Sequence, residues 1–313
     1  MPAHDTKKPA PVETWRHFSD SERARRARAP TFSRCSRCCP AASCGRAVPS
    51  SAAGGHCRWP YVGCDDAGRV MNLTITSASV KGPFPDAVGG LSALAYLDVS
   101  NNNISCAFPA TLYRCASLEH LDLSQNNFSN FPSPVFEMSE LEVLDLSLNA
   151  LTGSPFPDAV GGLSALTYLD VSNNTISGAF PTTLYRCASL DYLDLSCNNF
   201  SGEIVVHEFA AKSLRYIAIC ENYNPTAGSI PEAVGHLENL ACLYLFNNHL
   251  SGEIPASIGR IPSLYVLNLS NNRFNGTLPS ELGKHSELGF VVANYNEPGA
   301  PIVDGGVRGH HFR

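Results

Sequence analysis

YLDVSNNNIS, residues 96–105, decides the fold because close variants of it return along the chain. The same phrase reads YLDVSNNTIS at 168–177, YLDLSCNNFS at 192–201 and YVLNLSNNRFNG at 265–276. Aligned from Leu91, the unit has the spacing L-x-x-L-x-x-L-x-V-x-x-N-x-I, followed by F-P, and is 24 residues long. A fixed period of this length predicts a repeat architecture rather than a single closed core.

The repeat frame divides most of the chain into about ten units, of which the first and last are imperfect. They span 67–90, 91–114, 115–137, 138–162, 163–186, 187–210, 211–236, 237–260, 261–284 and a decayed unit from 285. The seventh and ninth positions of each unit are apolar, and this period of two predicts a short strand with alternate side chains inward. Stacked coils would then form an α/β repeat solenoid with one parallel sheet, at about 4.8 Å per coil.

The twelfth position of the unit is asparagine in eight repeats. An amide at the point where the chain leaves the strand can pair buried backbone groups that would otherwise lack partners. We therefore expect a structural asparagine ladder made of Asn102, Asn126, Asn149, Asn174, Asn198, Asn222, Asn248 and Asn272.

One block of the array is duplicated. Residues 83–129 recur 72 positions later as 155–201, which is a shift of three whole coils and preserves stacking. The copies differ only at the pairs Ala95/Thr167, Asn103/Thr175, Cys106/Gly178, Ala110/Thr182, Glu119/Asp191, His120/Tyr192 and Gln125/Cys197.

The first part of the chain differs in kind from the repeats. Of 313 residues with a net charge of -6, residues 1–58 carry 11 Lys and Arg against 4 Asp and Glu. We expect 1–55 to be a disordered basic segment without the apolar core of a signal peptide. Zinc binding at Cys35, Cys38, Cys39 and Cys44 stays the less favoured alternative, since no second spaced Cys/His pair follows.

The spacing, with GEIP at 252–255 and GTLP at 276–279, resembles the plant-specific class of leucine-rich repeats. The segments HCRWPYVGCDDAGRV (56–70), PDAVGGLSAL, LYRCASL and LYLFNNHLSGEIP (243–255) are similar to the ectodomain of HAESA-like receptor kinases. This resemblance, over roughly 56–293, implies a horseshoe with the parallel sheet on its concave face. It also implies an extracellular or plasma-membrane place, a secreted peptide ligand and a co-receptor.

Several features depart from that family. The sequence shows no apolar run long enough to span a bilayer, no kinase motifs, about half the family's number of coils and no later-coil R-x-R. On the family's W-x-x-x-G cap pattern, 56–66 is the N-terminal cap, with a disulfide between Cys57 and Cys64. Repeats then run over 67–295, and 296–313 is expected to be a frayed tail. Seven N-x-S/T sequons are candidate glycosylation sites: Asn72, Asn103, Asn127, Asn173, Asn199, Asn268 and Asn275.

The outward strand positions, six and eight of each unit, are the candidate ligand-binding residues of the concave face. They are Tyr96, Asp98, Asp122, Asp145, Tyr168, Asp170, Tyr192, Asp194, Tyr216 and Tyr244. The aspartates are either mere repeat consensus or an acidic, aromatic-lined track for a cationic or hydroxyl-rich partner. Five alike carboxylates with no evident pocket argue against a catalytic pair.

Two functions remain open on the sequence. One is a non-catalytic receptor-type ectodomain fragment that binds a peptide or protein ligand, with a co-receptor as a further partner. The other is a soluble inhibitor of a cell-wall-degrading enzyme, similar to the polygalacturonase inhibitors, although the cysteine-sealed C-terminal cap of those proteins is missing after Cys242. We expect no catalytic residue, cofactor or metal, and no nucleic-acid partner.

Overall fold

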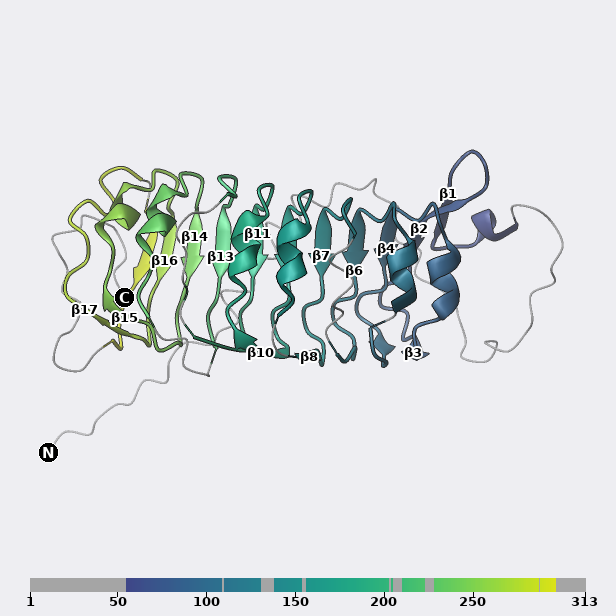
Figure 1. Ribbon diagram of the computed structural model, residues 1–313, viewed down its shortest axis with the longest axis horizontal. Helices are drawn as coiled ribbons and strands as arrows, with labels where there is room; N and C mark the ends of the chain where they lie inside the picture. Colours follow the sequence, from purple (N-terminus) through teal and green to yellow (C-terminus); the bar gives the residue numbers. More distant parts are fainter. Residues whose placement is uncertain are drawn as a thin grey trace, which may run out of the picture. The chain divides into compact units, whose positions relative to one another are not determined.

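The computed structural model describes residues 55–108, 110–130, 138–153, 156–202, 204, 210–222, 228–286 and 288–296. The expected disordered segment apart from Gly55, its four cysteines and the tail beyond 296 lie outside these residues. The described part is a single stack of coils in which strands of successive repeats stand side by side (Figure 1).

The main element is an 11-stranded sheet. Its strands, in spatial order, are β1 (Val62–Cys64), β2 (Val70–Thr74), β4 (Tyr96–Asp98), β6 (His120–Asp122), β7 (Val143–Asp145), β9 (Tyr168–Asp170), β11 (Tyr192–Asp194), β13 (Tyr216–Ala218), β14 (Cys242–Tyr244), β16 (Val266–Asn268) and β18 (Phe290–Val292). The predicted repeat frame fixes the register, because each residue pairs with the same repeat position in the next coil, as Leu97 does with Leu121. The parallel solenoid sheet predicted from the sequence is thus confirmed, with one addition. The cap strand β1 runs antiparallel to β2.

The turn after each strand requires one residue with a positive φ, which the sequence pattern does not reveal. The eleventh residue of each unit, from Asn101 to Tyr295, has a left-handed φ between 52° and 58°. Asparagine tolerates this conformation well, but Leu148 also adopts it, at 55°. Leu148 carries its strained φ with a side chain that is 44% exposed.

The expectation of one sheet is incomplete, because the extended segments beyond the asparagine ladder also pair. The small sheets are formed by β12 (Asn199–Ser201), β10 (Thr175–Ala179) and β8 (Thr152–Gly153), by β15 (Ser251–Glu253) and β17 (Arg273–Asn275), and by β3 (Lys81–Gly82) and β5 (Asn103–Ile104). The cause is the regular coil height, which brings equivalent return segments to hydrogen-bonding distance wherever both are extended.

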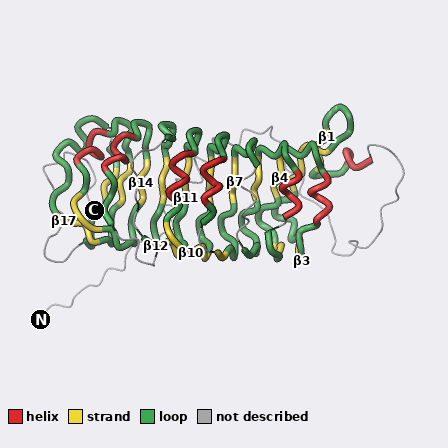
Figure 2. Tube along the Cα trace, in the orientation of Figure 1, coloured by secondary structure: helices red, strands yellow, loops and turns green. Residues whose placement is uncertain are grey.

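The helical segments of the described residues are short 3-10 turns. They are η1 (Gly55–Arg58), η2 (Asp86–Gly90), η3 (Ala110–Arg114), η5 (Asp158–Gly162), η6 (Thr182–Arg186), η7 (Glu232–His236) and η8 (Ala256–Arg260). A proline precedes η2, η5, η6, η7 and η8. Each of these segments is five residues long. Five residues are too few for a stable α-helix. Figure 2 shows these turns in red, apart from the yellow strands.

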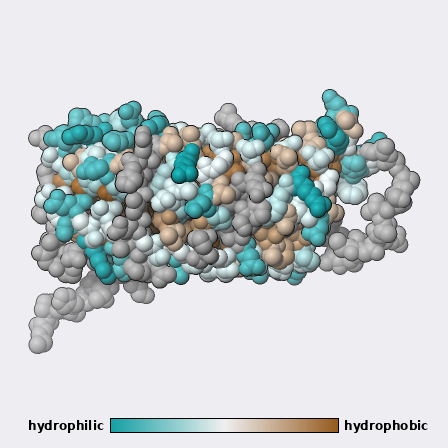
Figure 3. Space-filling view, viewed as in Figure 1, coloured by the Kyte–Doolittle hydropathy of each residue, from teal (hydrophilic) through white to brown (hydrophobic). Residues whose placement is uncertain are grey.

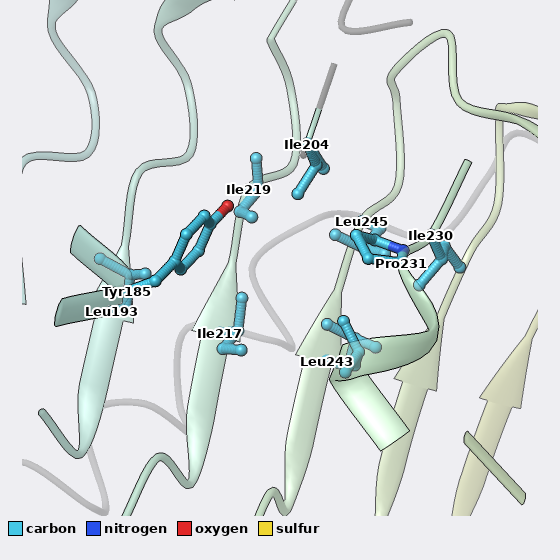
Figure 4. A pocket seen from close by; sticks show the side chains of 10 residues that line it. Tyr185, Leu193, Ile204, Ile217, Ile219, Ile230, Pro231, Leu243 and Leu245 are labelled. Atoms are coloured by element: carbon cyan, nitrogen blue, oxygen red, sulfur yellow. The ribbon is translucent and has the colours of Figure 1, made fainter. Parts of the chain in front are cut away.

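The core runs unbroken between turns and strands. The seventh-position leucines, such as Leu97, Leu121 and Leu169, are fully buried. A small apolar cavity lies within the described part of this core beneath β11, β13 and β14, lined by Tyr185, Ile204 and neighbouring aliphatic residues (Figure 4). Its volume of about 20 Å³ is the room of a single water molecule, so it offers no site for a larger ligand.

The surface on the side of the 3-10 turns is mixed. Hydrophobic patches there alternate with hydrophilic and neutral residues (Figure 3). Among the described residues, no helix has the length and apolar character that crossing a membrane requires.

Candidate recognition surface

The outer face of the large sheet, called here the sheet face, is made by repeat positions six and eight. The five aspartates of position eight stand on adjacent strands in strict register, since Asp98 pairs with Asp122, then Asp145, Asp170 and Asp194. At position six the order is Tyr96, His120, Val143, Tyr168, Tyr192 and Tyr216. The structure thus brings the sequence-predicted set onto one surface.

The aromatic rings of position six stack face to face along the coils. Tyr96 and His120 have centroids 4.1 Å apart and planes within 7°. The rings of Tyr168, Tyr192 and Tyr216 continue at 4.4 Å and 4.3 Å, within 9° and 7°. Tyr244, at position eight, joins the far end in a tilted contact of 5.5 Å. The aromatic column is interrupted at one strand, β7, where Val143 replaces a ring.

The five aspartates accept hydrogen bonds from the backbone, which bears on whether they are repeat consensus or a binding track. In all five, Oδ1 accepts a hydrogen bond from the amide of the serine two residues later, at 2.9 Å for Asp98, Asp122, Asp170 and Asp194 and at 3.0 Å for Asp145. Such a bond closes the turn that ends the strand. This geometry favours the consensus interpretation over a freely displayed acidic track.

Three of the five aspartates expected to face a ligand are buried rather than exposed. Asp145, Asp170 and Asp194 are 4%, 5% and 8% exposed. The hydroxyls of Tyr168 and Tyr192 donate to Oδ2 of Asp170 and Asp194, both at 3.4 Å, so the phenol of each coil bonds the carboxylate of its own strand. The residues that a partner meets first are therefore the partly exposed tyrosines, with Asp98 and Asp122.

Crowding of carboxylates changes their acidity. Burial, and next the charge of Asp145, raise the pKa of Asp122 to about 7. Burial also raises the pKa of Asp194. The pKa of His120 is lowered by burial, although the Asp98 charge opposes that shift. Near neutral pH the imidazole is accordingly uncharged, while Asp122 carries a fractional proton.

Position five, just before the strand, holds a charged residue in several units, and the sequence pattern did not single these residues out. Arg215 donates to both carboxylate oxygens of Asp191 on the preceding coil, from Nε at 2.6 Å and from Nη2 at 2.9 Å. The same positions three coils earlier hold the exposed carboxylates Glu119 and Glu142. The signal for Glu119 was the duplication, in which it is the counterpart of Asp191, and the signal for Glu142 was its repeat position, which Arg215 takes three coils later.

The position-twelve asparagines lie where the ladder requires. Asn174 is typical: Nδ2 donates to the carbonyls of Leu146 and Val171 at 3.0 Å, and Oδ1 accepts from the amide of Leu151 at 2.9 Å. Equivalent donations are made by Asn102, Asn126, Asn149, Asn198, Asn222, Asn248 and Asn272. Asn296, in the decayed unit, continues the series toward Leu269. Its spacing of 24 residues from Asn272 would have identified it.

The sequons fall into two groups. Asn72 and Asn268 lie on β2 and β16 of the large sheet, where a glycan would cover the sheet face. Asn103, Asn127, Asn173 and Asn199 are exposed, and Asn275 is half-buried. Glycosylation at any of them stays a prediction.

The cysteines of the cap form a disulfide between Cys57 and Cys64. Together with His56 these sulfurs make a compact group, but the disulfide leaves no thiolate there to hold a metal. The further described cysteines, among them Cys115 and Cys187, are free thiols.

Comparison with known proteins places this geometry in a family. Profiles described as Leucine rich repeat match 68–128 and 139–200, and further ones match 239–261 and 263–285, together more than half of the chain. The ectodomain of the receptor kinase GASSHO1 from Arabidopsis thaliana, solved with Casparian strip integrity factor 2, is 30% identical over 78% of this chain, with a TM-score of 0.73. The ectodomain of HAESA from Arabidopsis, solved with an extended IDA peptide hormone, is 28% identical over 77%, with a TM-score of 0.69.

A curated relative matches a shorter stretch. Polygalacturonase inhibitor 1 from Oryza sativa subsp. japonica is 50% identical over 44 residues, 14% of this chain and 13% of that protein. The chain also covers only 29% of the GASSHO1 ectodomain and 41% of the HAESA ectodomain, less than half of each. From the profile matches, the in-register sheet and the asparagine ladder it follows that the chain belongs to the leucine-rich repeat family.

Proposed function

We propose that this chain is a non-catalytic recognition module that binds a peptide or protein ligand on its sheet face, in plant cell-surface signalling. The observation that carries the proposal is the stacked aromatic column beside in-register aspartates, on a scaffold similar to ectodomains solved with peptide hormones. Tyrosine rings with polar tips lose little conformational freedom on binding and commonly anchor interfaces.

The charge of the surface defines the partner's chemistry. Asp98, Asp122, Glu119 and Glu142 provide a cluster of carboxylates at the N-terminal half of the sheet face. A partner that carries Lys or Arg would gain from this field, and its affinity would fall as salt screens the attraction. An extracellular or plasma-membrane location agrees with this function and is part of the proposal.

The experiment is a binding screen of the full chain against secreted basic peptides, at low and high salt. The proposal expects binders that weaken with salt and that compete with one another for one surface. If no peptide in the screen binds at low salt, the recognition of basic peptides is wrong.

A second candidate rests on the matching stretch of the rice polygalacturonase inhibitor. In that case the sheet face would block a cell-wall-degrading enzyme rather than hold a peptide. An inhibition assay with fungal polygalacturonases separates the two. Inhibition at an equimolar ratio, without peptide binding, would favour the inhibitor function.

A further inference from the structure

Coils that lie three repeats apart differ where they meet the sheet face. The position-six residues Tyr168, Tyr192 and Tyr216 form an unbroken stack. Three coils earlier the same repeat positions hold Tyr96, His120 and Val143, so the third ring is missing. The stack ends at His120 and resumes at Tyr168, with Val143 on the strand between them.

The second difference lies at position five, just before the same strands. Arg215 donates to Asp191 through two hydrogen bonds of 2.6 and 2.9 Å. Three coils earlier, Glu142 takes the repeat position of Arg215 and Glu119 that of Asp191. Where the later coil holds a guanidinium and a phenol ring, at Arg215 and Tyr216, the earlier one therefore holds a carboxylate and a short aliphatic side chain, at Glu142 and Val143.

The gap in the aromatic column at Val143 is called here the slot, and we define it by His120 and Tyr168 on either side, Val143 between them, and Glu119 with Glu142 just before the strands. Two strand steps separate the walls, about 9.6 Å, which admits one planar group between two ring faces. Asp122 and Asp145 lie at the inner end, on the strands of His120 and Val143.

We propose that this slot receives the side chain of an arginine from a peptide partner, with the guanidinium stacked on His120 and paired with Glu119. The proposal rests on the proposed function and names the residue type that the surface reads. The Arg215–Asp191 pair within the chain is the precedent for the geometry, since Glu119 stands at the position of Asp191.

The electrostatics of the slot suit this occupant. Burial lowers the pKa of His120, so its ring is neutral at pH 7 and does not repel a cation. Burial, and next the charge of Asp145, raise the pKa of Asp122, and a cation held in the slot would favour the charged form of both carboxylates. A planar cation combines stacking with bidentate pairing, whereas an ammonium can only pair, so arginine is preferred over lysine.

The test uses the full chain and the blocked peptide Gly-Gly-Arg-Gly-Gly, with counterparts in which lysine or citrulline replaces arginine. Lysine keeps the charge without the plane, and citrulline keeps the plane without the charge. We expect the arginine peptide to bind at least about tenfold tighter than either counterpart. Equal affinity for the arginine and lysine peptides would overturn the slot.

Two variants locate the binding. Val143→Tyr introduces the ring that Tyr216 supplies three coils later, so it should fill the slot and weaken binding of the arginine peptide at least tenfold, while thermal stability is kept or raised. Glu119→Gln removes the pairing carboxylate without adding volume and should weaken binding likewise. The matched control Asp158→Asn removes an exposed carboxylate from η5 and should leave binding unchanged.

The failure of the slot can be told from the failure of the proposed function. If Val143→Tyr and Glu119→Gln both bind the arginine peptide as the wild type does, the slot is wrong. If peptides from the basic screen still bind in that case, and lose affinity when the sheet face is altered, the recognition function stands.

Discussion

Arg215 clasps Asp191 across adjacent coils with two hydrogen bonds of 2.6 and 2.9 Å, while the equivalent Glu142 and Glu119 set two negative charges together. Glu142→Arg should recreate the pair three coils earlier, with Glu119 as its partner. Arg215 and Asp191 are 45% and 12% exposed, so solvent screens the pair and we expect a gain of about 0.2–1 kcal/mol. Urea unfolding at low and high salt measures it.

The control for this gain is the double variant Glu142→Arg with Glu119→Gln, which lacks the partner. A stabilisation that survives in the double variant, or that does not shrink at high salt, would show that Glu119 does not pair with the new arginine.

The asparagine ladder should contribute far more than exposed asparagines do. Asn174 makes hydrogen bonds to buried backbone groups of Leu146, Val171 and Leu151, and its loss leaves them without partners. Asn174→Ala should therefore cost about 1–3 kcal/mol in the free energy of unfolding. The proper control is exposed Asn103→Ala, because neighbouring Asn173 has a φ of 54°, which alanine tolerates poorly. Equal denaturation midpoints for the two variants would refute the ladder's contribution.

Replacing Leu148 should stabilise the folded chain. Its φ of 55° is unfavourable for a residue with a bulky side chain, and its side chain is exposed. Leu148→Asn should raise stability by about 1 kcal/mol, since asparagine accepts the left-handed region. Leu148→Ala is the control, because it removes the exposed apolar side chain but keeps a Cβ. An equal gain in both variants would attribute the effect to the side chain rather than to φ.

Stability should depend on pH through Asp122. Its folded-state pKa of about 7 lies above the ordinary value of 3.8, so the native chain binds a proton that the unfolded chain does not. The free energy of unfolding should rise as pH falls from about 8 toward 5, and this contribution is lost as pH rises through 7. His120 beside it works in the opposite sense, because its pKa is lowered.

Asp122→Asn separates these contributions, since the amide oxygen can still accept from Ser124. The variant should lose the Asp122 contribution and become more stable than the wild type above pH 7. Parallel stability profiles from pH 5 to 8 would contradict the raised pKa.

The strict periodicity explains how much could be predicted. Leucines at position seven and asparagines at position twelve recur so regularly that register and ladder follow from counting, as Leu97 opposite Leu121 demonstrates. Burial of Asp170 was not predictable, because it depends on the chain and rings that surround the carboxylate rather than on its own spacing.

The candidate site was predicted in its membership but not in its arrangement. Alternation placed the tyrosines and aspartates on one face, whereas ring stacking depends on side-chain torsions that no spacing encodes. Glu119 and Glu142 were not predicted, because position five has no constant residue. Only comparison of coils three repeats apart shows that two carboxylates stand where the later coils have an ion pair.

The central claim, recognition on the sheet face rather than on the side of the 3-10 turns, is tested most directly by two matched charge reversals. Glu119→Lys with Glu142→Lys reverses two charges just before β6 and β7, beside the sheet face. Asp86→Lys with Asp158→Lys reverses two charges in η2 and η5, with the same change in net charge. The affinity of a basic peptide from the screen, measured by calorimetry at low salt, should fall at least about tenfold in the first variant and less than about twofold in the second. Equal losses in both, or a loss in the second alone, would contradict recognition on the sheet face.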